Sequence, residues 1–233
     1  MLIIGIAGLL MLLLVAVHFG AGAMVRLRAE RRSRRKRSEA PYLALTYDDG
    51  PSDYMTPRVL ALLQEFNARA TFFVVGRQVE KRPEMLDRIR MEGHAVGWHS
   101  RSHLNAWKSG PISGFRDVRE MPEHLIDGDP KVRIFRPPYG KATFLGLIAM
   151  WMNRQRFIPW TFVSGDSFAS LPDMPQMLAA VERQNGGIIL MHDHDRSEAR
   201  TPEVEKYVLG LTRGLLELAA DKGWPVITLD QEC

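Results

Sequence analysis

Hydrophobic residues form one unbroken run at the start of the chain and only short runs after it. Residues 1–25 carry no charged side chain, and about 20 consecutive apolar residues suffice to cross the hydrocarbon core of a bilayer. The run therefore predicts a transmembrane anchor over residues 1–25. Two alternatives fit less well, because a signal peptide normally begins with a basic stretch and a buried core helix would not be followed at once by arginines. The small residues Ala21-Gly22-Ala23 keep signal-peptide cleavage open.

From Pro41 onward, short apolar segments alternate with helical patterns. The pattern predicts strands at residues 42–47, 71–75, 95–98, 134–136, 157–163, 187–191 and 226–229. It predicts helices at residues 57–67, 83–92, 178–184 and 202–221. Strands that alternate with helices are typical of right-handed βαβ units, so we expect an α/β fold with a parallel sheet or barrel. In such folds the functional residues gather at the carboxyl ends of the strands.

The composition is that of one ordinary globular domain, with 233 residues, 45% of them hydrophobic and 25% charged. The net charge of +4 is unevenly placed, because residues 26–37 hold eight Lys or Arg against the single acid Glu30. That segment carries +7 and leaves the remainder near −3, which disfavours nucleic acid as a partner. We predict three parts: a transmembrane anchor at 1–25, a basic juxtamembrane linker at 26–40 and a catalytic domain at 41–233.

The basic linker also predicts an orientation in the membrane. Lys and Arg favour the cytoplasmic side, and all eight lie on the C-terminal side of the anchor. The prediction is a single-pass protein of the cell membrane with a cytoplasmic catalytic domain, and an extracytoplasmic domain is the alternative. Each basic residue near the surface is attracted to anionic lipids by about 1 kcal/mol, so membrane lipids are expected partners. The simpler interpretation is that the basic residues are only a stop-transfer flank and a flexible linker. This interpretation and attraction to lipids can hold together.

Two polar pairs follow predicted strands and indicate a metal site. Asp48 and Asp49 come at the end of the first strand, where adjacent carboxylates are costly unless paired or bound to a cation. His99 and His103 follow the third strand at a spacing that lets both share one metal. Each pair alone is also compatible with a simple turn or with two surface histidines. The lone cysteine, Cys233, excludes a cysteine-rich site, so the set suits Zn²⁺ or another divalent transition metal in hydrolysis.

Three further polar residues stand at or just after predicted strand ends. Arg136 begins the RPPYG segment, Asp166 follows the fifth strand, and His192 follows the penultimate strand. Arg136 offers a fixed guanidinium to a carboxylate, although alone it is equally typical of a structural arginine. His192 alone is more typical of a buried imidazole with its hydrogen bonds satisfied. Their order along the chain, together with the two pairs above, gives each of them more weight.

The motifs TYDDGP, HSRSH, RPPYG, an aspartate after the fifth strand, and LMH occur in that order at strand ends. This arrangement resembles the polysaccharide deacetylase family, the NodB-like carbohydrate esterases, over about residues 41–230. The resemblance implies a distorted (β/α) barrel of the NodB-homology type, here preceded by one N-terminal transmembrane helix. It also implies a hydrolase that removes acetyl groups from N-acetylated sugars. The implied cofactor is one divalent cation, usually Zn²⁺, with Co²⁺ or another transition metal as the alternative.

The resemblance assigns the central roles by motif position. It implies that Asp48 is the general base and His192 the general acid. The implied metal ligands are Asp49, His99 and His103. In such a site the metal activates water and polarises the carbonyl, and acid–base assistance contributes roughly 10²–10⁴-fold.

Four more residues have supporting roles by the same resemblance. Arg136 would orient the base, and Asp166 would hold either that arginine or the catalytic histidine. The backbone N–H of Tyr139 would join the metal in stabilising the oxyanion, and Leu190 would line the pocket for the acetyl methyl.

The chain departs from the family pattern after the fifth predicted strand. Val163 stands where the family has an aspartate, and Ser167 stands where it has a tryptophan. Unless Phe168 replaces the missing aromatic wall, the acyl pocket has a different shape. These two positions leave the substrate preference open, but they do not touch the metal ligands or the base. Tyr47 in place of the usual Phe is a milder change.

Together these patterns predict metal-dependent N-deacetylation of an N-acetylated glycan in cell-envelope metabolism, with a lipid-linked amino sugar at the cytoplasmic face as the favoured substrate. One alternative is an extracytoplasmic deacetylase of peptidoglycan, chitin-like or exopolysaccharide chains. Another is a catalytically lapsed glycan-binding protein. The presence of the implied base, ligands and acid argues against the lapsed protein.

Overall fold

The computed structural model describes residues 2–126, 132–194 and 201–230, and Cys233 lies outside them. Its centre is a seven-stranded sheet in the order β5-β4-β3-β2-β1-β7-β6, in which every described pair is parallel. The strands are β1 (Tyr42–Asp48), β2 (Thr71–Val74), β3 (Ala95–Trp98), β4 (Ile134–Phe135), β5 (Arg156–Phe157), β6 (Phe162–Val163) and β7 (Gly186–His192). The predicted parallel α/β architecture is confirmed as a distorted half-barrel, with β5 and β6 as the two edges of the described sheet.

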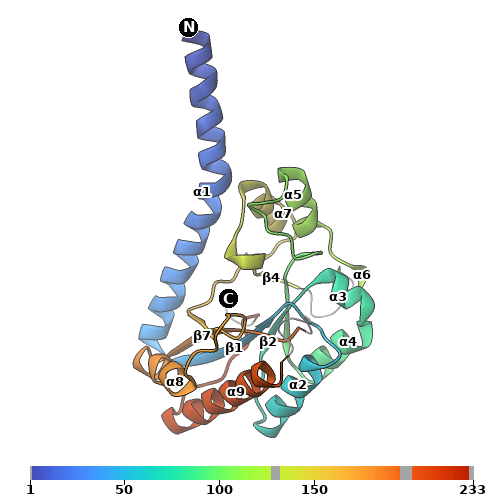
Figure 1. The fold of residues 1–233 in the computed structure, drawn as a ribbon, viewed down its shortest axis with the longest axis vertical. Helices are drawn as coiled ribbons and strands as arrows, with labels where there is room; N and C mark the ends of the chain where they lie inside the picture. The colour runs from blue at the N-terminus through green and yellow to red at the C-terminus, as the bar shows by residue number, and fades with distance from the viewer. Residues whose placement is uncertain (1, 127–131, 195–200, 231–233) are drawn as a thin grey trace.

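Helices flank this sheet and one of them extends far beyond it (Figure 1). The predicted helices correspond to α2 (Met55–Glu65), α4 (Pro83–Met91), α8 (Met174–Arg183) and α9 (Pro202–Lys222). The sequence pattern missed α3 (Gly76–Lys81), α5 (Pro111–Arg119), α6 (Glu123–Ile126), the 3-10 turn η1 (Pro138–Gly140) and α7 (Phe144–Met152). Helices α3 and α6 are too short for a periodic signal, and α7 is apolar on every side, so no polar face marks its period.

The central strand β1 is buried along its whole length, and its two faces have different tasks. Leu43, Leu45 and Tyr47 belong to the main core, and the Tyr47 hydroxyl lies 2.8 Å from the Thr212 hydroxyl of α9. Side chains alternate along a strand, so Thr46 and Asp48 point to the opposite, inner face of the half-barrel. One face of the sheet therefore packs on the hydrophobic core. The other face carries Thr46 and Asp48 into the interior of the half-barrel.

The predicted strand at residues 157–163 is wrong as a single element. The structure divides it into β5, which pairs with β4, and β6, which pairs with β7 at the opposite edge of the sheet. Between them the chain crosses the open side of the half-barrel through Pro159, which has no N–H to donate to a strand ladder. The predicted closing strand at 226–229 is reduced to one bridge between Val226 and Leu43.

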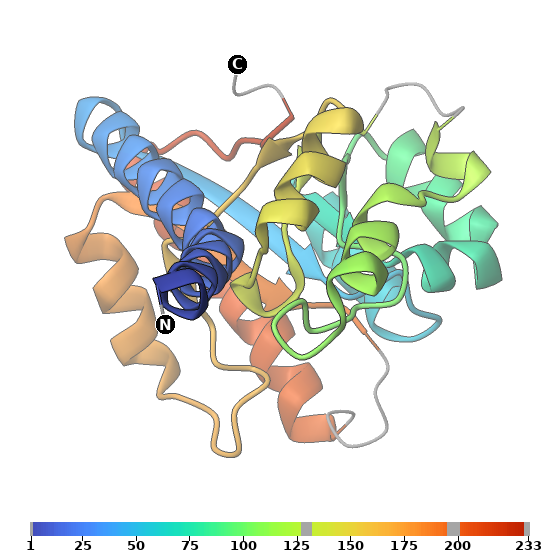
Figure 2. The same ribbon diagram turned by 90° about the horizontal axis from the view of Figure 1, so that it is seen from above.

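The first helix, α1 (Leu2–Glu39), continues without a break through the segment expected to be a linker. Its final turns pack on the domain, where Ser33 and Arg37 are buried. The Ser33 hydroxyl lies 3.0 Å from the Tyr42 hydroxyl, and Arg37 Nη2 donates to Gln184 Oε1 at 3.1 Å. Figure 1 shows the helix lying along one side of the domain while its N-terminal half projects beyond it, and Figure 2 shows the same helix from above, at that side of the domain. Residues 26–39 are thus a docked helix, and the three-part division of the chain stays a prediction.

Candidate metal and catalytic site

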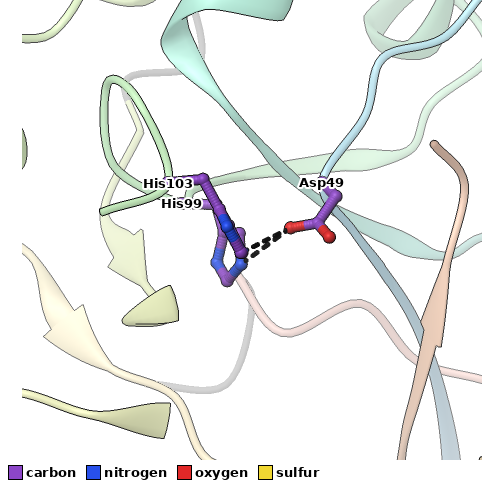
Figure 3. Close-up of side chains that lie close together, drawn as sticks. All are labelled: Asp49, His99 and His103. Carbon is purple, nitrogen blue, oxygen red and sulfur yellow. Dashed lines mark ion pairs between the residues drawn. The ribbon is translucent and has the colours of Figure 1, made fainter. Parts of the chain in front are cut away.

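Three predicted metal ligands meet at the carboxyl end of the sheet (Figure 3). Asp49 follows β1, and His99 and His103 lie in the loop after β3. Asp49 Oδ1 lies 2.8 Å from His103 Nε2 and 3.3 Å from His99 Nε2. One ligand atom from each residue lies within 4.8 Å of the others. Two imidazole nitrogens and one carboxylate oxygen at this spacing fit a divalent transition metal, with room left for water or substrate.

The surroundings of the trio fix which atoms face the centre. His99 Nδ1 lies 2.7 Å from the Arg136 carbonyl oxygen, so this nitrogen donates to the carbonyl, and Nε2 is the ring atom that faces Asp49. Burial acts to raise the pKa of Asp49. The hydrogen bonds and charges of His103 and His99 outweigh it and hold the pKa well below its ordinary value. The carboxylate is therefore ionised and ready to bind a cation.

The loop that carries the two histidines is held in an unusual backbone conformation. Ser100 and His103 have φ values of +68° and +57°, in the left-handed region that non-glycine residues seldom adopt. Asp117 of α5 supports this loop, since its Oδ1 accepts from Ser102 N at 2.8 Å and its Oδ2 from Leu104 N at 3.2 Å. Sequence analysis missed Asp117, because nothing in a short helix 14 residues after His103 marks it as a partner of that loop.

The predicted base, Asp48, is bound to the predicted orienting residue, Arg136. Arg136 Nη1 donates to Asp48 Oδ1 and to Thr46 Oγ1, both at 2.7 Å, and Nη2 donates to the Pro159 carbonyl at 3.2 Å. The Arg136 guanidinium is fully buried and lies 4.1 Å from the centre of the Phe73 ring. Burial lowers the pKa of Arg136, although the charge of Asp48 opposes this. The arginine thus fixes the carboxylate of Asp48 and leaves its second oxygen 3.8 Å from His99 Nε2.

The predicted acid, His192, is bound to Asp166. His192 Nδ1 lies 2.8 Å from Asp166 Oδ1, and the His192 backbone N–H donates to Oδ2 at 2.8 Å. Ser164 Oγ also donates to Oδ1 at 2.8 Å. Burial alone acts to lower the pKa of His192, but the charge and hydrogen bond of Asp166 outweigh it and raise the pKa to about 9. The resemblance left Arg136 and the catalytic histidine open as partners of Asp166. In the structure Asp166 bonds the histidine.

The pairing of β1 with β7 brings the base and the acid together. Asp48 stands opposite His192 in the parallel register, and Thr46 stands opposite Leu190. Leu190 is buried two residues before His192, so its side chain points to the same side of the sheet. Tyr139, with φ of +57°, lies next to the metal trio, where its ring is 4.8 Å from that of His103.

Two polar residues near the centre had no predicted role. Asp193 is buried and accepts from Thr56 Oγ1 at 2.6 Å and from Gly50 N at 3.1 Å, which ties β7 to the turn after Asp49. Burial, with added repulsion from Asp49 and Asp48, raises the pKa of Asp193 to about 7.

His194 Nε2 lies 3.6 Å from Asp49 Oδ2. The spacing of two between His192 and His194 was the available signal, because it places both on one side of an extended chain.

The metal trio opens into a polar cleft of about 560 Å³, a volume suited to a small ligand or one sugar unit. Its lining includes Asp49, His103, Tyr139 and His194. On the other side of His192, Ser167 lines a small pocket together with Tyr54 and Val204. Phe168, left open as a replacement for the missing aromatic wall, is more than half exposed.

This arrangement can perform hydrolysis at a carbonyl carbon. A divalent cation bound at the trio would supply Lewis acidity and an activated water. Asp48, fixed by Arg136, is placed to accept a proton beside the metal ligands. His192, kept protonated by Asp166, is placed to donate a proton to a leaving nitrogen. A proton acceptor and a protonated donor on neighbouring strands, opposite each other in register, suit acid–base catalysis.

Comparison with known proteins agrees with this chemistry. The sequence model of a family described as polysaccharide deacetylase matches residues 35–145, which include the metal trio, Asp48 and Arg136. Peptidoglycan-N-acetylglucosamine deacetylase of Bacillus cereus is 29% identical over 67% of this chain and 75% of its own length. Chitooligosaccharide deacetylase of Sinorhizobium fredii is 33% identical over 66% of this chain and 73% of its own length. The solved structure of the peptidoglycan N-acetylglucosamine deacetylase Bc1960 superposes with a TM-score of 0.70, at 25% identity, over 82% of this chain and 86% of that one.

Matches to other Bacillus cereus deacetylases of the same description span less of the relative. Two of them are covered over 50% and 63% of their own length.

Proposed function

The chain belongs to the polysaccharide deacetylase family, a family of carbon–nitrogen hydrolases, and we propose from this premise that it removes the acetyl group from N-acetylglucosamine units of a cell-envelope glycan. The observation that carries the proposal is the convergence of the Asp49–His99–His103 trio with two further pairs. These are Asp48 with Arg136 and His192 with Asp166. Both pairs lie at the carboxyl end of the sheet, beside the trio.

In the proposed reaction, Asp48 takes a proton from the attacking water while its position is held by Arg136. The water oxygen forms a bond to the acetyl carbonyl carbon, and the bond from that carbon to the sugar nitrogen then breaks. His192 gives its proton to the nitrogen, so the products are acetate and a free amino sugar. Asp166 orients His192. The backbone N–H of Tyr139 is the proposed oxyanion donor, and Leu190 the proposed contact of the acetyl methyl.

Peptidoglycan is the favoured glycan. Support comes from the relatives in Bacillus cereus and from Bc1960, which are described as deacetylases of N-acetylglucosamine in peptidoglycan. A chitin-like oligomer is chemically close and is supported by the Sinorhizobium relative. This substrate class replaces the lipid-linked amino sugar as the leading proposal.

A lipid-linked amino sugar is the second candidate, and one specific observation favours it. Exposed arginines, among them Arg28, Arg31, Arg32, Arg34 and Arg35, follow the apolar part of α1, and the positive-inside rule would put them and the catalytic domain in the cytoplasm. A peptidoglycan substrate calls for the opposite face. We propose α1 as a membrane anchor in both cases, because it is the helix of the described chain whose length and composition suffice to cross a bilayer. A reporter fused to the C-terminus distinguishes the two orientations.

The decisive experiment measures acetate release from peptidoglycan, from chitin-like oligomers and from a lipid-linked N-acetylated sugar. We expect release that depends on a divalent metal and is lost in Asp48→Asn, while Asp87→Asn on α4 serves as the matched control. Metal binding with no acetate release from any of the three substrates would instead support a lapsed, glycan-binding protein.

A further inference from the structure

Apolar and aromatic side chains are exposed on the domain at the point where α1 leaves it. Trp107 is 46% exposed, Ile112 66% and Phe144 43%. Two cationic residues accompany them, Lys108 and Lys141, and the Lys141 ammonium lies 5.1 Å from the centre of the Trp107 ring. We name these five residues the apolar rim. They come from two segments, the loop before α5 with the first turn of that helix, and the turn before α7 with its first residue. These segments lie side by side near α1 (Figures 1 and 2).

Direct contacts join the rim to the apolar part of α1. The ring of Phe19 lies 6.0 Å from that of Trp107, in an edge-to-face arrangement. Three residues later, Gly22 packs so closely on the carbonyl of Ala142 that no larger residue fits there without a shift. On the N-terminal side of this contact the side chains of α1 stand exposed and apolar, as at Leu9 and Leu12. The exposed hydrophobic surface of α1 and that of the domain are therefore continuous.

We propose that the apolar rim is a membrane-contact surface that sits in the headgroup region of the bilayer crossed by α1. The inference rests on the proposed role of α1 as an anchor. Trp is enriched at the membrane–water interface because its large ring is apolar and its N–H is polar. Lys108 and Lys141 supply charge for lipid phosphates, and long lysine side chains of this kind reach the headgroups while their stems cover apolar surface. Continuity with α1 favours lipid over a second copy of the chain, because a helix in the membrane holds this face against the bilayer.

The rim also places the catalytic site. The loop with His99 and His103 continues directly into Trp107, and the turn with Tyr139 continues into Phe144. Two parts of the cleft lining, at His103 and at Tyr139, thus lead into the membrane-contact surface. The consequence is a substrate class: the site receives glycan that lies close to the membrane surface, and distant layers of a cell-envelope polymer are out of reach.

The test uses the full chain in lipid nanodiscs whose acyl chains carry bromine, which quenches tryptophan fluorescence at short range. We expect Trp107→Phe to lose at least half of the quenching that the wild type displays. Trp224→Phe is the matched control and should leave the quenching unchanged. Trp224 lies next to Pro225, whose carbonyl accepts a hydrogen bond from Leu43 N just beyond the C-terminal end of α1. Equal quenching in wild type and Trp107→Phe overturns the proposal, as does burial of Trp107 between two copies with no quenching by lipid.

A second variant tests the consequence for substrate. Ile112→Asp puts a charge on an exposed position outside the catalytic machinery. Acetate release from a soluble chitin-like oligomer should stay within twofold of wild type, while release from a nanodisc-bound lipid-linked substrate should fall at least fivefold. Equal losses on both substrates would contradict the inference. Failure of the proposed function would look different, because the wild type would then release acetate neither from these two substrates nor from peptidoglycan. Failure of the anchor would appear as a chain that does not enter nanodiscs.

Discussion

Replacement of Asp166 by Asn tests the catalytic assignment most sharply. Asp166 touches His192 twice, through the ring nitrogen and through the backbone N–H, both at 2.8 Å. Asparagine has nearly the same shape and keeps a carbonyl oxygen for one of these bonds, but it removes the negative charge. The substitution therefore changes the proton affinity of His192 with little change in its position.

The size of the effect follows from the environment of the imidazole. His192 has a pKa of about 9 against an ordinary value of 6.5, even though burial alone acts to lower it. Without the charge of Asp166, the pKa should fall to 6.5 or below. At about 1.4 kcal/mol per pH unit, this corresponds to roughly 3 kcal/mol less stabilisation of the imidazolium. The acid form of His192 would then be the minority form at pH 7.

The assay is the pH profile of kcat/KM for acetate release, measured on wild type, Asp166→Asn and the control Asp221→Asn, whose carboxylate is exposed on α9. The alkaline limb reports loss of the proton from the general acid. We expect it at least two pH units lower in Asp166→Asn and unchanged in the control. An alkaline limb at the same pH in all three proteins would refute the assignment of His192 as the acid held by Asp166.

The same pair makes stability depend on pH. A histidine whose pKa is raised on folding stabilises the protein fully below pH 6.5, and this stabilisation is lost as pH rises through about 9. The wild type should therefore lose up to roughly 3 kcal/mol across this window. Asp166→Asn should lose much less, as followed by chemical denaturation in detergent.

Three other substitutions have defined outcomes. Arg136→Met should cost about 3–5 kcal/mol of unfolding free energy, because it leaves the carboxylate of Asp48 buried without its cation; an unchanged denaturation midpoint would contradict this. His103→Ala should lose bound metal by elemental analysis while His124→Ala, on α6, retains it, and chelation of the wild type should abolish acetate release until Zn²⁺ is restored. Asp117→Asn should weaken metal binding roughly 10–100-fold through the loop it supports, measured by competition with a chelating dye.

Local patterns in the sequence were enough to predict a metal site and the class of the fold. Ligand type is a property of single side chains, and the His99–His103 spacing is local. The alternation of strands and helices predicts parallel strands, whose carboxyl ends all lie on the same side of the sheet. Residue types and their positions after strands predicted a metal site, and the family resemblance implied the base and the acid. The structure brings Asp49, His99 and His103 together and places Asp48 opposite His192.

Tertiary structure alone decided how these residues are held. Asp166 bonds His192 rather than Arg136, Asp117 supports the histidine loop from a different element, and the predicted strand at 157–163 serves both edges of the sheet. The basic segment at residues 26–39 is the end of α1 and is docked on the domain. Each of these outcomes depends on contacts between residues far apart in the chain. Periodicity and motif spacing report only on local geometry, so such contacts leave no mark in them.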